Sequence, residues 1–207
     1  MHHCAFNNEL DKLRVFVKHM KMYYSQAGEG DTPASTQCRL NMQAWVNEPN
    51  SEGYLPAHYA CLYGNVEMLH YLEELGTNML YKSNAGESLL HMCAQNNQLA
   101  PMLYLTTKDL NFNETNSEAE TCLHQASGKG FVDIVSFLAA LPDINLNAQN
   151  HRLETPLMLA VKDNKPEVVK RLLVKGADKT IVNNDNETPS EVAKEKGFVR
   201  IEAILNS

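Results

Sequence analysis

Residues 153–164 of the chain have the sequence Leu-Glu-Thr-Pro-Leu-Met-Leu-Ala-Val-Lys-Asp-Asn, and four other segments align with this stretch without gaps. These segments are residues 53–64, 86–97, 119–130 and 186–197. The sixth position of each falls at residues 58, 91, 124, 158 and 191, so the spacings are 33, 33, 34 and 33 residues. A fixed period of this length indicates a repeat array, in which each unit packs only against its neighbours.

The residue types within each unit predict a pair of helices. Proline at the first turn of a helix loses no hydrogen bond, and it recurs at one offset, at Pro56, Pro156 and Pro189. Apolar residues then recur at helical spacing, for example at Val132, Val135 and Leu138. Each unit is therefore predicted to contain a turn, a short helix, a tight connection, a longer helix and an extended loop.

These segments resemble the ankyrin-repeat family, whose period is 33 residues and whose signature Thr-Pro-Leu-His-x-Ala is echoed at residues 155–157 and 123–126. The resemblance implies an all-α repeat fold, an ankyrin-type solenoid of helix-turn-helix units joined by β-hairpin loops. It also implies that His58, His91 and His124 support the turn before each first helix by hydrogen bonding. Met158 and Glu191 occupy the same position and would lose that role.

The N-terminal residues continue the register, with His2 where His58 falls in the next unit, but the interval is 56 residues, which is 23 more than one period. The surplus lies around residues 24–37, whose composition predicts a loop. We therefore expect an N-terminal capping repeat over residues 1–46 with a long insertion at about 25–45, then repeats over 47–79, 80–112, 113–146 and 147–179. A C-terminal capping repeat over 180–207 completes six units.

Composition limits the class of protein and of partner. The 207 residues carry 18 Lys and Arg against 25 Asp and Glu, and residues 51–140 alone hold three basic and ten acidic side chains. An acidic middle repels phosphate, so we expect no nucleic acid. The sequence contains neither an apolar stretch long enough to span a bilayer nor a legible targeting peptide, and the five cysteines form no CxxC pair. We therefore expect an intracellular protein, cytoplasmic or nuclear with an organelle as the open alternative, with reduced thiols and no direct insertion into a membrane.

Two groups of residues could carry a metal site or a nucleophile, but the repeat pattern explains their presence better. His91 with Cys93, and Cys122 with His124, could be imagined around zinc, but both histidines occupy the repeat's turn-supporting position. A nucleophilic Cys38 would need a histidine and an orienting carboxylate, and the repeat accounts for most of the histidines. We therefore expect no metal, no cofactor and no enzymatic activity.

What remains is a surface for a protein partner. The resemblance implies that partners bind across the first helices and the hairpin loops, where variable residues lie. The candidate partner-binding residues are Phe6, Tyr54, Leu62, Tyr63, Tyr81, Lys82, Gln95, Asn96 and Lys129. The apolar members gather in the first half of the array, which favours a partner with an apolar centre, and the acidic middle of the chain favours basic residues around that centre. The alternative is packing, in which Phe6 or Tyr54 covers the insertion at 25–45.

The sequence therefore favours a non-catalytic interaction module, that is, an adaptor, a scaffold or an inhibitor. A constitutive structural subunit of a larger assembly, anchored through the 25–45 insertion, is the competing hypothesis. An enzyme that uses Cys38 or the His/Cys pairs is a third class without support from the residues.

Overall fold

The computed structural model describes residues 7, 9–25 and 33–206. In these residues there are twelve α-helices and no regular strand. Two long helices come first, α2 (Leu10–Ser25) and α3 (Pro33–Val46). Five pairs follow: α4 (Pro56–Leu62) and α5 (Val66–Glu74), α6 (Leu89–Gln95) and α7 (Leu99–Leu105), α8 (Cys122–Lys129) and α9 (Val132–Leu138), α10 (Pro156–Lys162) and α11 (Pro166–Val174), α12 (Pro189–Glu195) and α13 (Val199–Leu205).

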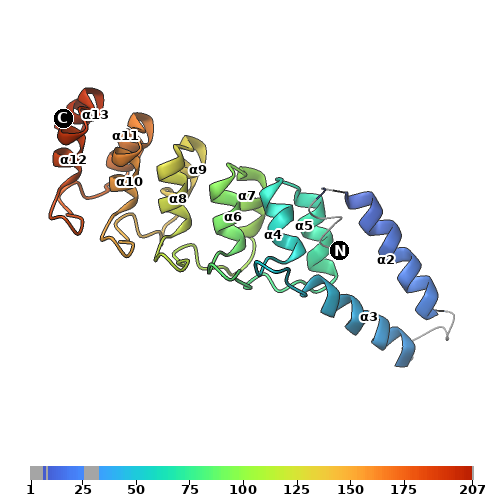
Figure 1. Cartoon of the computed structure of the whole chain (residues 1–207). Helices are drawn as coiled ribbons and strands as arrows, with labels where there is room; N and C mark the ends of the chain where they lie inside the picture. Colours follow the sequence, from blue (N-terminus) through green and yellow to red (C-terminus); the bar gives the residue numbers. More distant parts are fainter. Residues whose placement is uncertain (1–6, 8, 26–32, 207) are drawn as a thin grey trace.

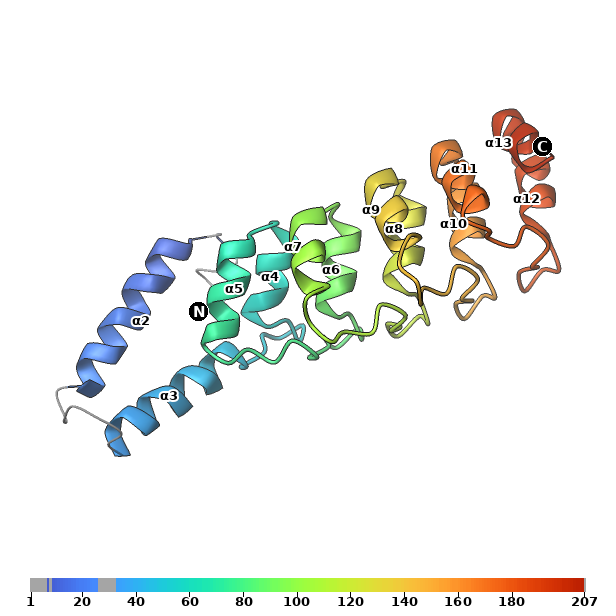
Figure 2. The same ribbon diagram turned by 180° about the vertical axis from the view of Figure 1, so that it is seen from behind.

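The pairs stand one after another along an elongated array (Figure 1), and the view from behind shows the loops gathered along one edge (Figure 2). First helices pack on first helices, as α4 on α6 and α6 on α8, and second helices on second helices, as α9 on α11. The all-α solenoid predicted from the repeat is therefore confirmed. The second helix is longer than the first only in the α4–α5 and α10–α11 pairs.

Small buried side chains set the distance between first helices. A small buried residue recurs at a single offset in every pair and is at most 1% exposed; it is alanine at Ala60, Ala126, Ala160 and Ala193 and cysteine at Cys93, with Ala94 one position later. A small side chain at this position lets neighbouring backbones approach closely, while larger apolar side chains fill the space between the two rows of helices. Among these, Leu69, Leu105, Leu138 and Leu172 are fully buried.

The hairpin loops, which we call the fingers, are residues 47–55, 75–88, 106–121, 139–155 and 175–188. Successive fingers are joined by one recurring backbone hydrogen bond, from Asn84 N to Glu52 O (3.1 Å), Ser117 N to Ala85 O (2.9 Å), His151 N to Glu118 O (3.1 Å) and Asn184 N to Arg152 O (3.0 Å). Asparagine side chains close the turns within them; Asn116 Oδ1, for example, accepts from the amides of Glu118 and Glu120. The fingers thus form an ordered edge built from turns, with one antiparallel bridge recorded, between Thr115 and Thr121.

A buried histidine holds each of three units to the next. His58 Nδ1 accepts from the amide of Leu55 at 3.1 Å, so the hydrogen of the neutral ring sits on Nε2, which donates to the carbonyl oxygen of Glu87 at 3.3 Å. His91 repeats this with the Ser88 amide and Glu120 O, and His124 with the Thr121 amide and Glu154 O. The turn-supporting role implied by the family resemblance is present, and each ring also bonds the following unit.

The replacement residues behave differently from one another. Met158 cannot accept at the turn, and only the bond from its amide to Thr155 Oγ1 remains, at 3.2 Å. Glu191, however, accepts from both the amide and the hydroxyl of Thr188 at 2.7 Å. The expectation that Glu191 loses the turn-supporting role is therefore wrong, because a carboxylate at the third helical position closes a capping box as well as an imidazole does.

The N-terminal region departs from the predicted loop over residues 24–37. Helix α2 runs to Ser25, and helix α3 begins at Pro33, so the prediction fails at both ends of that stretch. The missed signal is a four-residue apolar spacing at Cys38, Met42 and Val46, all buried. Proline fits the first turn of α3 for the reason given above. The division of the chain into six units remains an interpretation of the sequence, and residues 1–6 of the expected capping repeat lie outside the described residues.

Buried apolar side chains of α2 and α3 join the core of the regular pairs, and polar and aromatic groups add further contacts. Phe16 of α2 and Trp45 of α3 have ring centroids 5.7 Å apart. Arg14 lies 3.7 Å from a carboxylate oxygen of Glu67 and over the ring of Tyr71, both on α5. The two long helices are thus fixed to each other and to the first regular pair.

Replacing a core leucine tests the linear packing. Leu138→Ala leaves a cavity where a fully buried side chain stood, and we expect a loss of about 2–5 kcal/mol in unfolding free energy. Lys170→Ala, on the exposed face of α11, serves as the matched control and should be nearly neutral. Urea unfolding measures both; equal effects would contradict the assigned packing.

The histidine bonds predict an acid-dependent stability. Burial lowers the pKa of His58 and of His124 to about 4, and it lowers the pKa of His91 as well, because the charged ring loses its hydration. On acidification the histidines of the unfolded chain bind protons near pH 6.5, whereas the buried histidines of the folded chain stay neutral to lower pH. The free energy of unfolding is therefore highest above pH 6.5 and falls towards pH 4, by about 1.4 kcal/mol per pH unit for each histidine.

Urea unfolding at pH 7.5 and pH 5 measures this loss. His124→Gln should reduce the difference between the two pH values, because the amide does not titrate. A variant that keeps the full acid sensitivity of the native chain would show that other groups cause it.

Candidate functional site: the inner face

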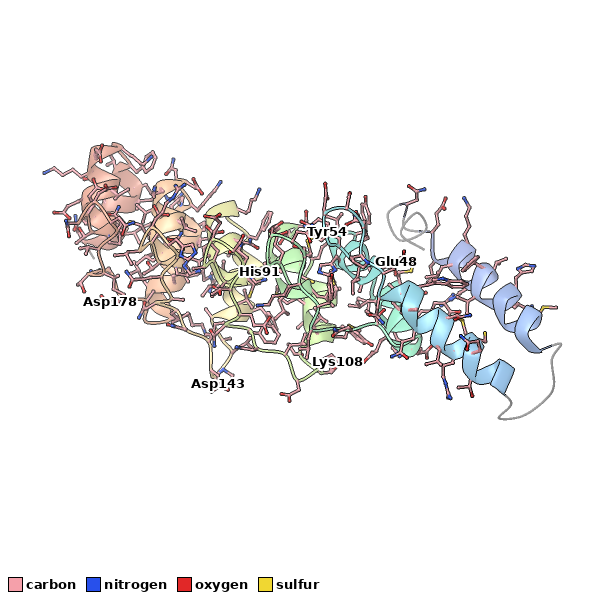
Figure 3. All side chains as sticks on the ribbon, turned by 60° about the horizontal axis from the view of Figure 1, so that its bottom comes forward. Glu48, Tyr54, His91, Lys108, Asp143 and Asp178 are labelled. Carbon is pink, nitrogen blue, oxygen red and sulfur yellow. The ribbon has the colours of Figure 1, made fainter. Side chains whose placement is uncertain are left out.

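The inner face is the surface formed by first helices α4, α6, α8 and α10 together with the fingers that precede them. Figure 3 shows the side chains with the finger edge of the array turned forward; Tyr54 and His91 are labelled near the helices, and Asp143 and Asp178 on the loops. Of the predicted partner-binding residues, Phe6 lies outside the described residues. The other eight belong to this face or to its fingers.

Tyrosine side chains surround the first histidine of the array. The Tyr54 ring lies 5.4 Å from the ring of His58 and 6.2 Å from that of Tyr59, and the Tyr81 ring meets His58 edge-on at 6.5 Å. Burial, followed by the hydrogen bond and negative charge of Glu87, raises the pKa of Tyr54 to about 12. Tyr54 and Tyr81 are half-buried, so part of each ring supports the fold and part remains available for contact.

Leu62 and Tyr63 differ in solvent exposure although they are adjacent in the sequence. Leu62 is half-buried against the core, and its carbonyl accepts from Gln98 Nε2 at 3.1 Å. Tyr63 closes the end of α4 and is 42% exposed. Tyr63 is therefore the freer anchor of the two.

The polar candidates are mostly engaged within the array. Lys82 Nζ bonds the Thr115 carbonyl at 3.2 Å and pairs with Glu114 at 3.4 Å, which ties two fingers together. The Asn96 amide bonds the carbonyl oxygen one turn earlier, at 2.8 Å. Gln95 donates to Glu87. Lys129 is exposed at the end of α8.

Sequence analysis missed a row of glutamates on this face. The residue four positions before the turn-supporting position is a glutamate in four of the five units, namely Glu87, Glu120, Glu154 and Glu187 at spacings of 33, 34 and 33, and it is Tyr54 in the first. Their recurrence was a legible signal. Glu154 is buried and pairs with Lys162 of α10.

A cleft of about 500 Å³ opens where α6, α8 and α10 meet the fingers, and Glu120, Gln125, Gly128, Lys129, Leu159 and Asp163 are among its lining residues. A neighbouring cleft of about 470 Å³ shares Glu120, Leu159 and Asp163 with it. Burial raises the pKa of Glu120; the amide of Asn150 opposes this, and the nearby carboxylates of Glu118 and Glu154 add to it. The inner face thus holds a hollow with a half-buried acid at its wall.

The His/Cys groups have no arrangement for metal or for nucleophilic chemistry. Both ring nitrogens of His91 and of His124 are used in the hydrogen bonds described above. No cluster of three or more His, Cys, Asp or Glu side chains suited to a metal ion occurs among the described residues. Burial raises the pKa of Cys93 well above its ordinary value and that of Cys122 to about 12, which leaves both thiols uncharged near neutral pH. Cys38 is also buried.

None of the described helices combines the length and the apolar character needed to cross a bilayer.

Comparisons with known proteins give the same picture of the chain. A family model described as "Ankyrin repeats (3 copies)" matches residues 90–183 and 123–204, and one described as "Ankyrin repeat" matches residues 52–78. The ankyrin repeat protein YahD of Escherichia coli (strain K12) is 26% identical over 188 residues, which are 88% of this chain and 93% of that protein.

Two further relatives are longer than the matched region. The probable 26S proteasome regulatory subunit p28 of Saccharomyces cerevisiae is 24% identical over 148 residues, 70% of this chain and 65% of that protein. An L-asparaginase of Dirofilaria immitis is 26% identical over 168 residues, 66% of this chain and 28% of that protein. The chain therefore spans less than two thirds of the length of both.

Metal removal tests the interpretation of the His/Cys pairs. We expect EDTA or a thiol-reactive zinc chelator to leave the melting temperature unchanged, because the ring nitrogens of His91 and His124 already serve the repeat. A structural metal site worth more than about 1 kcal/mol would lower the melting temperature by several degrees on chelation. Thermal unfolding with and without chelator decides between the two.

Proposed function

The chain belongs to the ankyrin-repeat family, and on that premise we propose that it is a non-catalytic interaction module, an adaptor, scaffold or inhibitor that binds a protein partner across its inner face. Ankyrin repeats generally mediate protein–protein interactions, so the class of partner follows from the family. The part of the inner face that is used, and the role of the complex, are our proposals.

The observation that carries the proposal is the tyrosine cluster at the N-terminal end of the inner face. Tyr63 is exposed; Tyr54 and Tyr81 lie half-buried against His58, and the half-buried Tyr59 packs against Tyr54 and lies one helical turn before Tyr63. Rigid aromatic side chains with a polar tip are common anchors of interfaces, because they bury much area for little loss of side-chain freedom. Leu62 contributes a small apolar edge beside Tyr63.

Charge supports the same surface. The net charge of −7 equals the balance of residues 51–140, three basic against ten acidic side chains (3 − 10 = −7). A partner that presents basic residues around an apolar centre would be guided to this part of the array by long-range attraction. Lys82, Gln95, Asn96 and Lys129 would then lie at the rim, where contacts add specificity.

The competing proposal is a constitutive subunit of a larger assembly, anchored through residues 25–45, which include most of α3, with α2 beside them. Val15, Phe16 and Met22 of α2 and Leu40 of α3 are each more than 40% exposed, which is unusual for large apolar side chains on neighbouring helices. The similarity to a proteasome regulatory subunit in yeast is compatible with such a role. Size-exclusion chromatography of the endogenous protein separates the two, since a constitutive subunit elutes only with its complex and an adaptor also elutes alone.

An alanine substitution at Tyr63 tests the proposed surface. Affinity capture with mass spectrometry first identifies the partner, and titration calorimetry with the purified partner then measures the dissociation constant. We expect Tyr63→Ala to weaken binding by about 1–2 kcal/mol, roughly 5- to 30-fold. Association should also slow with added salt, because rim charges act mainly on encounter.

Leu103→Ala is the matched control, because Leu103 is 47% exposed on second helix α7, away from the inner face. Lys162→Ala is unsuitable as a control, since it would leave the buried carboxylate of Glu154 without its cation. Loss of the partner with Leu103→Ala and its retention with Tyr63→Ala would refute the proposed surface.

A further inference from the structure

We infer that the cleft beside Glu120 is a subsite for an arginine side chain of the protein partner, an inference that rests on the proposed function and names the chemistry the partner must present. Four features carry it: the missing donor from helix α8 at Glu120, where the side-chain amide of Asn150 is a donor from the next finger, the shape given by Gly128, the acceptors around the cleft and the charges that face it.

The glutamate row shows what is special about this position. Glu87 accepts from Gln95, and Glu154 accepts from Lys162, so in both units the side chain eight residues later supplies the donor. Eight residues after Glu120 the chain has Gly128, which has no side chain to donate. Glu120 is thus the one member of these three that lacks the donor provided by the first helix of its own unit.

Gly128 also shapes the cleft. It lies inside α8, and a Cβ placed on it would come within 3.0 Å of Asp163 Oδ2 and 3.8 Å of Leu159 Cβ. The absent side chain therefore opens the space between Glu120 and the next first helix, while a second carboxylate approaches the same backbone. A side chain from outside can occupy the volume that Gln95 and Lys162 fill in their own units.

The lining of the cleft is rich in acceptors on separate elements. Glu120 precedes α8, Gln125 belongs to α8, and Asp163 ends α10. Gln125 Oε1 is shielded from solvent and accepts no hydrogen bond from the described residues. This oxygen can turn towards an incoming donor without giving up an existing bond. Leu159 supplies an apolar wall for a methylene stem.

The charges around Glu120 favour a cation. Burial, together with the carboxylates of Glu118 and Glu154, holds the Glu120 pKa above the ordinary value although the hydrogen bond from Asn150 opposes the shift, so a positive group placed in the cleft would relieve an unfavourable environment. Arg152 opposes this effect only in part. Lys162 is already paired with Glu154, and no ion pair is recorded for the exposed Lys129 within the described ranges.

Arginine fits this set better than the other candidates do. A guanidinium offers five N–H donors in a planar fork, which can serve acceptors on three elements at once, whereas an ammonium is a compact point charge. A divalent metal would need several close ligands, and no such group is found in the part of the chain that the structure describes. An anion would be repelled by the carboxylates of Glu120 and Asp163.

Nuclear magnetic resonance titration of the full chain tests the inference directly. The probe is N-acetyl-arginine methylamide, and the control probe is the citrulline analogue, which has the same shape without the charge. We expect saturable shifts of the backbone amides of Glu120, Gln125, Gly128 and Asp163 with the arginine probe and none with citrulline. Equal shifts with citrulline or with the lysine analogue, or arginine shifts only elsewhere, would overturn the assignment.

Two substitutions locate the site. Glu120→Gln keeps the shape but removes the charge, and we expect it to weaken binding of the arginine probe roughly tenfold. Gly128→Gln supplies the internal donor that Gln95 provides to Glu87 and fills the cleft, so it should abolish binding while the melting temperature stays at or above that of the native chain. Glu187→Gln, the corresponding carboxylate of the last unit, is the matched control and should leave binding unchanged. Unchanged binding with Glu120→Gln would overturn the inference even if Gly128→Gln failed to fold.

The result is separable from the test at Tyr63. If Tyr63→Ala releases the partner and the arginine probe leaves the cleft amides unshifted, the proposed function stands and the arginine subsite is refuted. If the probe binds the cleft in the manner described and Tyr63→Ala keeps the partner, the subsite stands and the tyrosine surface is refuted.

Discussion

The array depends on a neutral imidazole that bonds in two directions. In three consecutive units the ring accepts from the amide that opens its own first helix and donates to a carbonyl of the next unit. Each ring is fully or almost fully buried, so a proton added to Nδ1 would face a donor with no water to replace the lost bond. The same contact therefore fixes the start of a helix, the register of the following finger and the charge state of the ring.

The inner face inherits its geometry from these bonds. The carbonyls that accept from the histidines belong to Glu87, Glu120 and Glu154, so the backbone of the glutamate row is fixed by the histidine row. What each glutamate does then depends on the residue eight positions later. A glutamine there donates to the carboxylate, a glycine leaves an open cleft, and a lysine forms an ion pair with the buried carboxylate. One framework thus produces three local chemistries in adjacent units.

The N-terminal helices differ from the regular pairs in length and in the exposure of their apolar side chains. α2 and α3 have 16 and 14 residues, against seven to nine in the regular pairs, and several of their large apolar side chains remain exposed. Their buried apolar residues join the core of the array, and Arg14 adds an exposed ion pair with Glu67 and a contact with the ring of Tyr71. The two ends of the chain are accordingly different surfaces, and the tyrosine cluster lies next to the N-terminal one.

The sequence by itself determined the repeat, the helix pairs and the structural use of the histidines, because these depend on residue types at a fixed spacing along the chain. It also contained two signals that were overlooked, the four-residue spacing of Cys38, Met42 and Val46 and the recurrence of the glutamates. Only the tertiary structure decided that Glu191 closes its turn, that Lys162 is committed to Glu154, and that Gly128 leaves a cleft beside Glu120. Those outcomes depend on which side chains from a finger and from two neighbouring helices come into contact. The packing of adjacent units decides these contacts, so the pattern of residues along the chain does not specify them.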